Sequence, residues 1–184
     1  MTRPTLSRIV LPFAAVTLIW GTTWYVIKTQ LGVVPPQWSV TYRFMTASLL
    51  MFAACLVMRR NLRFPLSAHG FFLALGLFQF AGNFNFVYQA SRSITSGLIA
   101  VVFALLVVPN ALFARLFLKQ PISGRFLIGA ALGIVGVALL FERELTETGW
   151  SGAFITGLML TGCAVILASV SNVMQGTERA RTYD

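Results

Sequence analysis

The sequence predicts an all-α fold, a polytopic membrane helix bundle with six transmembrane spans. Hydrophobic residues make up 57% of the chain and charged residues only 10%, against roughly 25% charged residues in ordinary soluble domains. The apolar residues fall into long runs, and a helix needs about 20 such residues to cross the hydrocarbon core. They do not alternate with a period of two, as they would in a transmembrane barrel. The runs therefore predict six helices joined by short connectors.

The first run, Ile9 to Gln30, combines an uncharged first half with small and hydroxyl residues further on. Trp20, Trp24 and Lys28 are four residues apart, so they share one face of a helix. Lipid offers polar atoms no partner, and we expect this face to meet protein or a water-filled cavity. For the aromatic residues, an interfacial belt is the alternative. The candidates for lining a substrate path are Trp20, Gly21, Thr22, Trp24 and Tyr25.

The second predicted span, Trp38 to Met58, follows Pro35-Pro36, which ends one helix and starts the next. Its notable residue is Arg43, which lies about 7 to 8 Å inside the span. An arginine at the bilayer centre costs roughly 2.5 to 3.5 kcal/mol, and nearer the surface it can snorkel at a smaller cost. Two interpretations stay open for Arg43: a snorkelling anchor, or a cation that faces a cavity and attracts anionic groups.

The third predicted span, Gly70 to Gln89, carries four amide side chains: Gln79, Asn83, Asn85 and Gln89. At 100° per residue these side chains fall within an arc of about 160°. Such a polar arc should not face lipid. It either bonds to neighbouring helices or lines a polar path.

The remaining predicted spans run from Thr95 to Leu118, from Phe126 to Phe141 and from Gly152 to Val173. Pro109 lies inside the first of these and cannot donate a backbone hydrogen bond to Leu105, so the helix should kink. Gly129 and Gly133 form a G-x-x-x-G pattern in the next span. This pattern predicts a close helix–helix contact.

The basic residues predict how the chain is oriented. If the N-terminus is cytoplasmic, ten of the 14 Lys and Arg residues fall on the cytoplasmic side: Arg3, Arg8, Arg59, Arg60, Arg63, Arg115, Lys119, Arg125, Arg179 and Arg181. The other four fall on the opposite side: Lys28, Arg43, Arg92 and Arg143. The positive-inside rule therefore predicts a multi-pass protein of the cytoplasmic membrane with its N-terminus in the cytoplasm.

No group of residues indicates catalysis. The acidic residues lie outside the predicted spans, the single histidine starts a helix, and the sequence has no G-x-x-x-x-G-K-[ST] phosphate loop. We therefore expect no enzyme, no metal and no cofactor. The net charge of +9 is spread between the apolar runs rather than gathered in one patch, so no nucleic-acid binding is predicted. The expected partners are the lipid bilayer and a small-molecule substrate.

Several motifs follow one another in a characteristic order. They are Trp20-Gly21-Thr22-Thr23-Trp24-Tyr25, Pro35-Pro36, Arg43-Phe44, Asn85-Phe86-Val87-Tyr88-Gln89-Ala90, Thr95-Ser96-Gly97-Leu98-Ile99-Ala100, Pro109 and the glycine-rich stretch Gly129 to Val137. In this order the chain resembles the EamA-type transporters of the drug/metabolite transporter (DMT) superfamily. One departure is Gln120, which stands where the family pattern usually has a Glu.

The resemblance implies ten spans, built from two five-helix repeats of opposite orientation with a substrate path between them. It places Trp20, Gly21, Arg43 and Pro109 at positions of the recurring motif. It also implies two domains: residues 1–145 as the first repeat, and residues 146–184 as the start of a second repeat with one helix and a cytoplasmic tail.

We therefore predict a carrier, or the N-terminal portion of one truncated after the first repeat plus one helix. It would move small metabolites, amino acids and related compounds among them, by alternating access. Six spans alone would form half of a path, so a homodimer or a separate second half is expected. The alternative is a truncated, non-transporting membrane protein or an interaction subunit.

Overall fold

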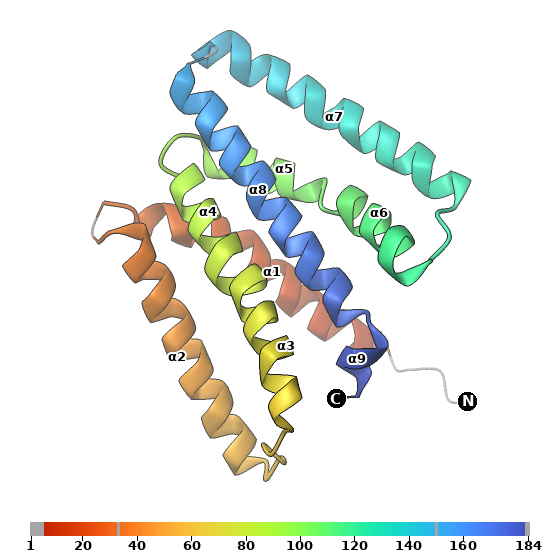
Figure 1. Cartoon of the computed structure of the whole chain (residues 1–184). Helices are drawn as coiled ribbons and strands as arrows, with labels where there is room; N and C mark the ends of the chain where they lie inside the picture. Colours follow the sequence, from red (N-terminus) through yellow and green to blue (C-terminus); the bar gives the residue numbers. More distant parts are fainter. Residues whose placement is uncertain (1–5, 33, 150, 183–184) are drawn as a thin grey trace.

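The computed structural model describes residues 6–32, 34–149 and 151–182, and helices dominate it (Figure 1). The elements are α1 (Leu6–Gln30), α2 (Pro36–Val57), α3 (Leu66–Gly76), the π-helix η1 (Leu77–Gly82), α4 (Asn83–Ala90), α5 (Ser96–Ala104), α6 (Val107–Leu118), α7 (Gly124–Thr148), α8 (Gly152–Gln175) and α9 (Glu178–Arg181). In the described residues, six helical stretches are long and apolar enough to cross a membrane: Ile9–Gln30, Pro36–Val57, Leu66–Ala90, Ser96–Leu118, Gly124–Glu142 and Gly152–Gln175. The predicted all-α fold class and the six spans are confirmed.

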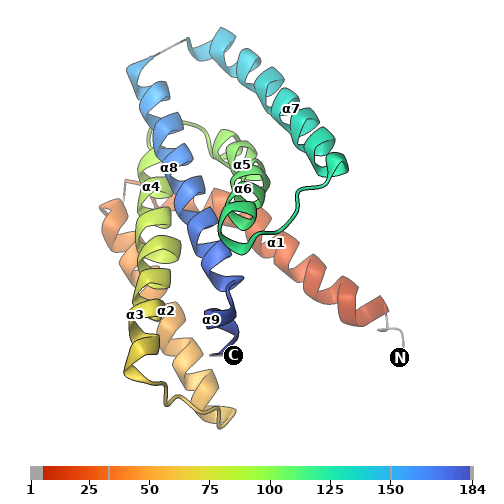
Figure 2. The ribbon, with the colours of Figure 1, turned by 45° about the vertical axis from the view of Figure 1, so that its right-hand side comes forward.

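The last span, α8, lies at the centre of the bundle (Figures 1 and 2). It packs against α4, η1, α5 and α6, and 39% of its apolar stretch is buried, against 0% for the first span and for α7. Small residues on α8, such as Gly157, Ala164 and Ala168, are buried at these contacts, which lets neighbouring backbones approach closely. The assignment of α8 to a second repeat stays a prediction.

Two of the spans are not regular α-helices. The third span passes through η1, where each turn holds an extra residue. The fourth span is interrupted at Leu105 and Leu106, between α5 and α6. Pro109 has no N–H to donate to Leu105, and the N–H of Val108 donates to the Leu105 carbonyl instead, at 2.9 Å. The kink predicted from Pro109 is confirmed.

Two hydrogen bonds join the carboxyl ends of α1 and α4. Lys28 Nζ donates to the Ser91 carbonyl at 2.9 Å, and the Tyr88 hydroxyl donates to Gln30 Oε1 at 2.5 Å. Beneath these bonds lies the buried core, which includes Ile27, Val87, Ile99 and Phe154. These contacts hold the ends of α1 and α4 in one place relative to the start of α8.

Helix α7 lies at the periphery and stands apart from the other spans (Figure 2). It meets the bundle near its carboxyl end, where the Phe141 ring lies 6.2 Å from the Phe154 ring. A methyl group added at Gly129 or Gly133 would meet no atom within 4 Å. The predicted close contact at this G-x-x-x-G pattern is therefore wrong for the part of the chain that the structure describes, because these glycines point away from the other helices.

Candidate functional site

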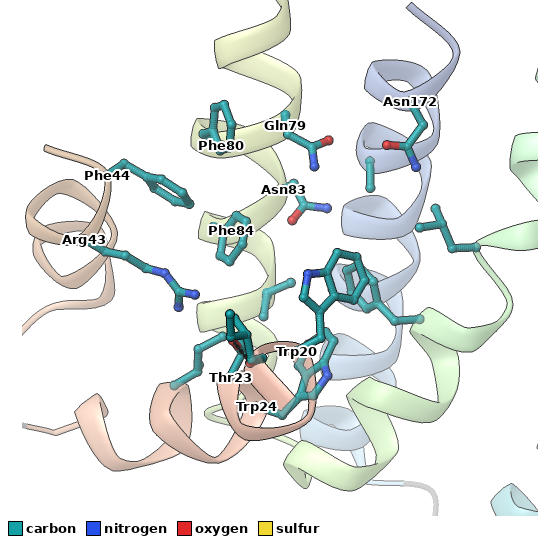
Figure 3. Close-up of a pocket in the computed structure, with 16 residues that line it drawn as sticks. Trp20, Thr23, Trp24, Arg43, Phe44, Gln79, Phe80, Asn83, Phe84 and Asn172 are labelled. Carbon is teal, nitrogen blue, oxygen red and sulfur yellow. Dashed lines mark hydrogen bonds between the residues drawn. The ribbon is translucent and has the colours of Figure 1, made fainter. Parts of the chain in front are cut away.

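A cavity of about 290 Å³ opens among the central helices (Figure 3). Helices α1, α2, α4, α5 and α8 and the π-helix η1 supply its wall, together with Leu106 at the break of the fourth span. Its aromatic lining residues are Trp20, Trp24, Phe44, Phe80, Phe84 and Phe103. Its polar lining residues are Thr23, Arg43, Gln79, Asn83 and Asn172.

Arg43 is the only charged residue in the wall. Its guanidinium carbon lies 5.0 Å from the centre of the Phe84 ring and 5.9 Å from that of Phe44, close enough for cation–π attraction. Phe44 in turn packs against Phe80 and Phe84, with ring centres 4.9 and 4.8 Å apart. Rings from η1 and α4 therefore hold Arg43 of α2 toward the cavity (Figure 3). Its role there stays a prediction.

The wall contains no Asp or Glu. Among the residues that the structure describes, no group of three or more His, Cys, Asp or Glu side chains could hold a metal ion. The chemistry of this wall is therefore that of one cation, amides and aromatic rings.

The amide groups of the wall differ in their hydrogen bonding. Asn83 Nδ2 donates to the Ala164 carbonyl at 2.7 Å, which ties α4 to α8. Asn172 Nδ2 lies 3.4 Å from Asn110 Oδ1. Gln79 Oε1 is buried and accepts no hydrogen bond from the described chain. A buried acceptor normally has a partner, so Gln79 can take a donor from a ligand or from water.

Five of the predicted path residues line the cavity, and six do not. Trp20, Trp24, Arg43, Gln79 and Asn83 lie in the wall, whereas Gly21, Thr22, Tyr25, Asn85, Gln89 and Pro109 lie elsewhere. Whether any of the eleven contacts a substrate stays a prediction.

The residues outside the cavity have other surroundings. The Thr22 hydroxyl donates to the Leu18 carbonyl of its own helix at 2.8 Å, and Tyr25 is 72% exposed on the outer face. Asn85 Nδ2 donates to the Ala81 carbonyl at 2.7 Å. An arc of about 160° is too wide for one cavity wall. Gln79 and Asn83 form the edge of that arc which meets the cavity, and Asn85 and Gln89 form the other edge.

Sequence reasoning missed several lining residues: Phe80, Phe84, Phe103, Ala168 and Asn172. A weak signal existed for some of them. Phe80 and Phe84 repeat the four-residue spacing of Gln79 and Asn83 one position further on, and Ala168 and Asn172 have the same spacing on α8. Spacing identifies a shared face, but it does not show which helix that face meets.

Relatives with transporter names cover most of this chain. Protein PagO of Salmonella typhimurium is 28% identical over 150 residues, which are 80% of this chain and 49% of PagO. The uncharacterized inner membrane transporter YedA of Escherichia coli K12 is 32% identical over 145 residues, which are 77% of this chain and 46% of YedA. An uncharacterized transporter of Buchnera aphidicola is 24% identical over 161 residues, 86% of this chain and 54% of that protein. The chain thus spans about half the length of these curated relatives.

No solved structure is a significant match to the chain. The model of the EamA-like transporter family matches residues 7–142, which is well over half of the sequence. The six membrane spans and the transporter-named relatives agree with that match. The chain therefore belongs to the EamA-like transporter family.

Proposed function

We propose that this chain forms part of a carrier for small metabolites that bear a carboxylate, such as amino acids and related compounds. The observation that carries the proposal is Arg43, which lies in the cavity wall on the Phe84 ring. It forms no ion pair with any carboxylate of the described chain, so its charge is available to a ligand.

The composition of the wall supports this class of substrate. A guanidinium binds a carboxylate through two parallel hydrogen bonds. Gln79 Oε1 lacks a donor, and an ammonium group on the same substrate would supply one. The aromatic rings around Arg43 suit an apolar body. A volume of about 290 Å³ is at the small end of ligand sites, which supports a small metabolite.

We propose alternating access as the mechanism. Two irregular stretches border the cavity: η1 supplies Gln79 and Phe80, and Leu106 lies at the break between α5 and α6. Irregular backbone at membrane depth is tolerated where it lines a cavity, and such stretches can change shape with fewer broken hydrogen bonds than a regular helix. Movement at these two places would open the cavity to one side and then to the other.

We further propose that a second half completes the path, either as a second copy of this chain or as a separate chain. Each relative carries roughly as many further residues as it shares with this chain. Chemical cross-linking in native membranes, followed by native mass spectrometry, tests this idea. A dimer or a complex with another membrane chain is expected. A chain that stays monomeric at every concentration while binding substrate would contradict it.

Substrate binding tests the role of Arg43. Trp20 and Trp24 line the cavity, so their fluorescence should change when the purified chain is titrated with a panel of amino acids. We expect Arg43→Ala to weaken binding roughly 10- to 100-fold, since a hydrogen bond to a charged group contributes about 1.5 to 3 kcal/mol. Arg43→Lys should bind with intermediate affinity because it keeps the charge but not the planar fork.

The matched control is Arg125→Ala, which removes an exposed arginine at the start of α7, outside the cavity. This variant should bind as the unchanged chain does. Equal affinity of Arg43→Ala and Arg125→Ala would return Arg43 to the role of a snorkelling anchor. Uptake into proteoliposomes then extends the comparison from binding to transport.

A further inference from the structure

A second, basic cleft lies where the carboxyl ends of α1 and α4 meet the starts of α5 and α8 (Figure 1). Its volume is about 300 Å³. Its lining includes Lys28, Arg92, Ile94, Thr95, Ser151 and Phe154. We call it the basic cleft.

The basic cleft is separate from the cavity at Arg43, because no residue lines both. One buried apolar cluster lies between the two spaces. Ile27 and Val87 of this cluster line the cavity, whereas Ile94 and Phe154 line the basic cleft. Ile27 is 1% exposed and Val87 is 2% exposed, so this wall is densely packed. A ligand in the basic cleft would not touch Arg43.

The two cations of the basic cleft are not neutralised. Lys28 Nζ donates one hydrogen bond, to the Ser91 carbonyl at 2.9 Å. That bond orients the ammonium group toward the ends of the helices and leaves two of its three N–H donors. Arg92 is exposed and also lines the adjoining space beside Pro35 and Pro36. Neither side chain forms an ion pair within the described chain.

One acidic residue competes for these cations from the end of α7. Glu142 follows Phe141, whose ring contacts Phe154 of the basic cleft, so its carboxylate lies at the same end of the bundle. It is exposed and does not line the basic cleft. Solvent therefore screens its charge, and the cleft itself keeps a positive field.

Two helix starts add to that field. Thr95 caps α5 and accepts a hydrogen bond from the Leu98 N–H at 3.3 Å. Ser151 caps α8 and accepts one from the Phe154 N–H at 3.1 Å. Each helix start carries a partial positive charge and directs backbone N–H groups outward. With Lys28 and Arg92, four sources of positive potential therefore border one space.

We propose that the basic cleft binds a phosphate group, supplied by the headgroup of an anionic phospholipid or by a free phosphate compound. A phosphate offers several oxygens in different directions, so it can accept from the Arg92 fork and from the Lys28 ammonium at once. The cleft lies at the end of the membrane spans, where headgroup phosphates are abundant. Occupation would brace α1, α4, α5 and α8 against one another.

Binding measurements on the full chain in a neutral detergent test this proposal. Native mass spectrometry would count bound phosphatidylglycerol and phosphatidylcholine, and the thermal unfolding midpoint would be followed against inorganic phosphate and against each lipid. The variants are Lys28→Gln and Arg92→Gln, singly and together. Arg92 makes no hydrogen bond within the described chain, so Arg92→Gln removes no internal bond. Arg125→Gln is the matched control, because it removes an equal charge away from the cleft.

A basic residue near the membrane surface contributes about 1 kcal/mol to the binding of an anionic lipid, or roughly fivefold in affinity. We expect each cleft variant to weaken binding about fivefold, the double variant to weaken it about 25-fold, and Arg125→Gln to leave it unchanged. Competition by inorganic phosphate would identify a free phosphate compound as the source. Saturable binding of phosphatidylglycerol without such competition would identify the lipid headgroup.

Two results would overturn the proposal: equal weakening by Arg125→Gln, which would indicate general attraction to a positive protein, or unchanged affinity in the double variant. Neither depends on the proposed substrate. Amino acid binding at Arg43 can fail while phosphate binding stands, and the reverse also holds.

Discussion

At the scale of single residues, Gln79 and Asn83 lie one turn apart in the same cavity wall and yet differ in hydrogen bonding. Asn83 Nδ2 donates to Ala164 across to α8 at 2.7 Å, whereas Gln79 Oε1 is buried without a donor. A buried polar atom without a partner destabilises the folded protein by about 1 to 3 kcal/mol. A residue retained in that state is more useful to a ligand than to the fold.

We therefore predict opposite effects of two matched substitutions on stability. Gln79→Leu should raise the free energy of unfolding by up to about 1 kcal/mol, because it removes an unsatisfied buried acceptor. It should also weaken binding of a substrate that carries an ammonium group. Asn83→Leu should lower the free energy of unfolding by about 0.6 kcal/mol, the average for a hydrogen bond between membrane helices. Thermal unfolding in detergent gives both values, and a loss of stability in Gln79→Leu would show that Gln79 has an internal partner.

The sequence predicted part of this wall. Polar residues within apolar spans pointed to Arg43, Gln79 and Asn83, because lipid cannot satisfy them. The same reasoning also selected Thr22 and Asn85, which bond to the backbone of their own helices. Helix periodicity cannot separate these two outcomes, because short polar side chains have a local acceptor on any face.

At the scale of elements, the two irregular spans differ in how visible they are in the sequence. Pro109 marks the break between α5 and α6, since a residue without an N–H interrupts the backbone ladder. The π-helix η1 has no comparable signal in Leu77 to Gly82. Its extra residue per turn depends on how the third span packs against α8, which is a tertiary contact. Gly82 shows this dependence, because an added methyl group would lie 2.6 Å from Leu167 of α8.

Helix α8 offers a direct test of close packing through two of its glycines. A methyl group at Gly157 would lie 2.8 Å from Cγ2 of the buried Ile94, whereas one at Gly162 would meet nothing within 4 Å. We expect Gly157→Ala to lower the free energy of unfolding by about 1 to 3 kcal/mol through overpacking. Gly162→Ala should leave it unchanged or raise it by up to about 1 kcal/mol, because alanine is the better helix former.

Thermal unfolding midpoints of the two variants, measured side by side in one detergent, check this prediction. Both changes add one methyl group to the interior of the same helix, so propensity alone would shift both midpoints equally upward. A lower midpoint for Gly157→Ala only is the expected result. Equal shifts would mean that α8 does not pack against Ile94 as described.

At the scale of the whole molecule, the ends of the spans form two sides with different charge. The carboxyl end of α2, the start of α3 and the start of α7 carry Arg59, Arg60, Arg63 and Arg125. The opposite side carries Lys28 and Arg92, where α1 and α4 end. The short connectors bring the predicted charge bias directly to the membrane surface, where it acts on orientation. Which side faces the cytoplasm depends on that bias and not on packing.

Labelling of single cysteines tests the orientation. Cys55 and Cys163 are free, and replacing both with alanine gives a background for Arg63→Cys and Arg92→Cys, which lie at opposite ends of the bundle. The positive-inside rule counts ten basic residues on the side of Arg63 and four on the other. In intact cells, a membrane-impermeant maleimide should therefore label Arg92→Cys, and Arg63→Cys should react only after permeabilisation. The reverse pattern would place the N-terminus outside and turn the basic cleft toward the cytoplasm. Equal labelling of both sites would show a mixed orientation, which a ten-to-four bias should prevent.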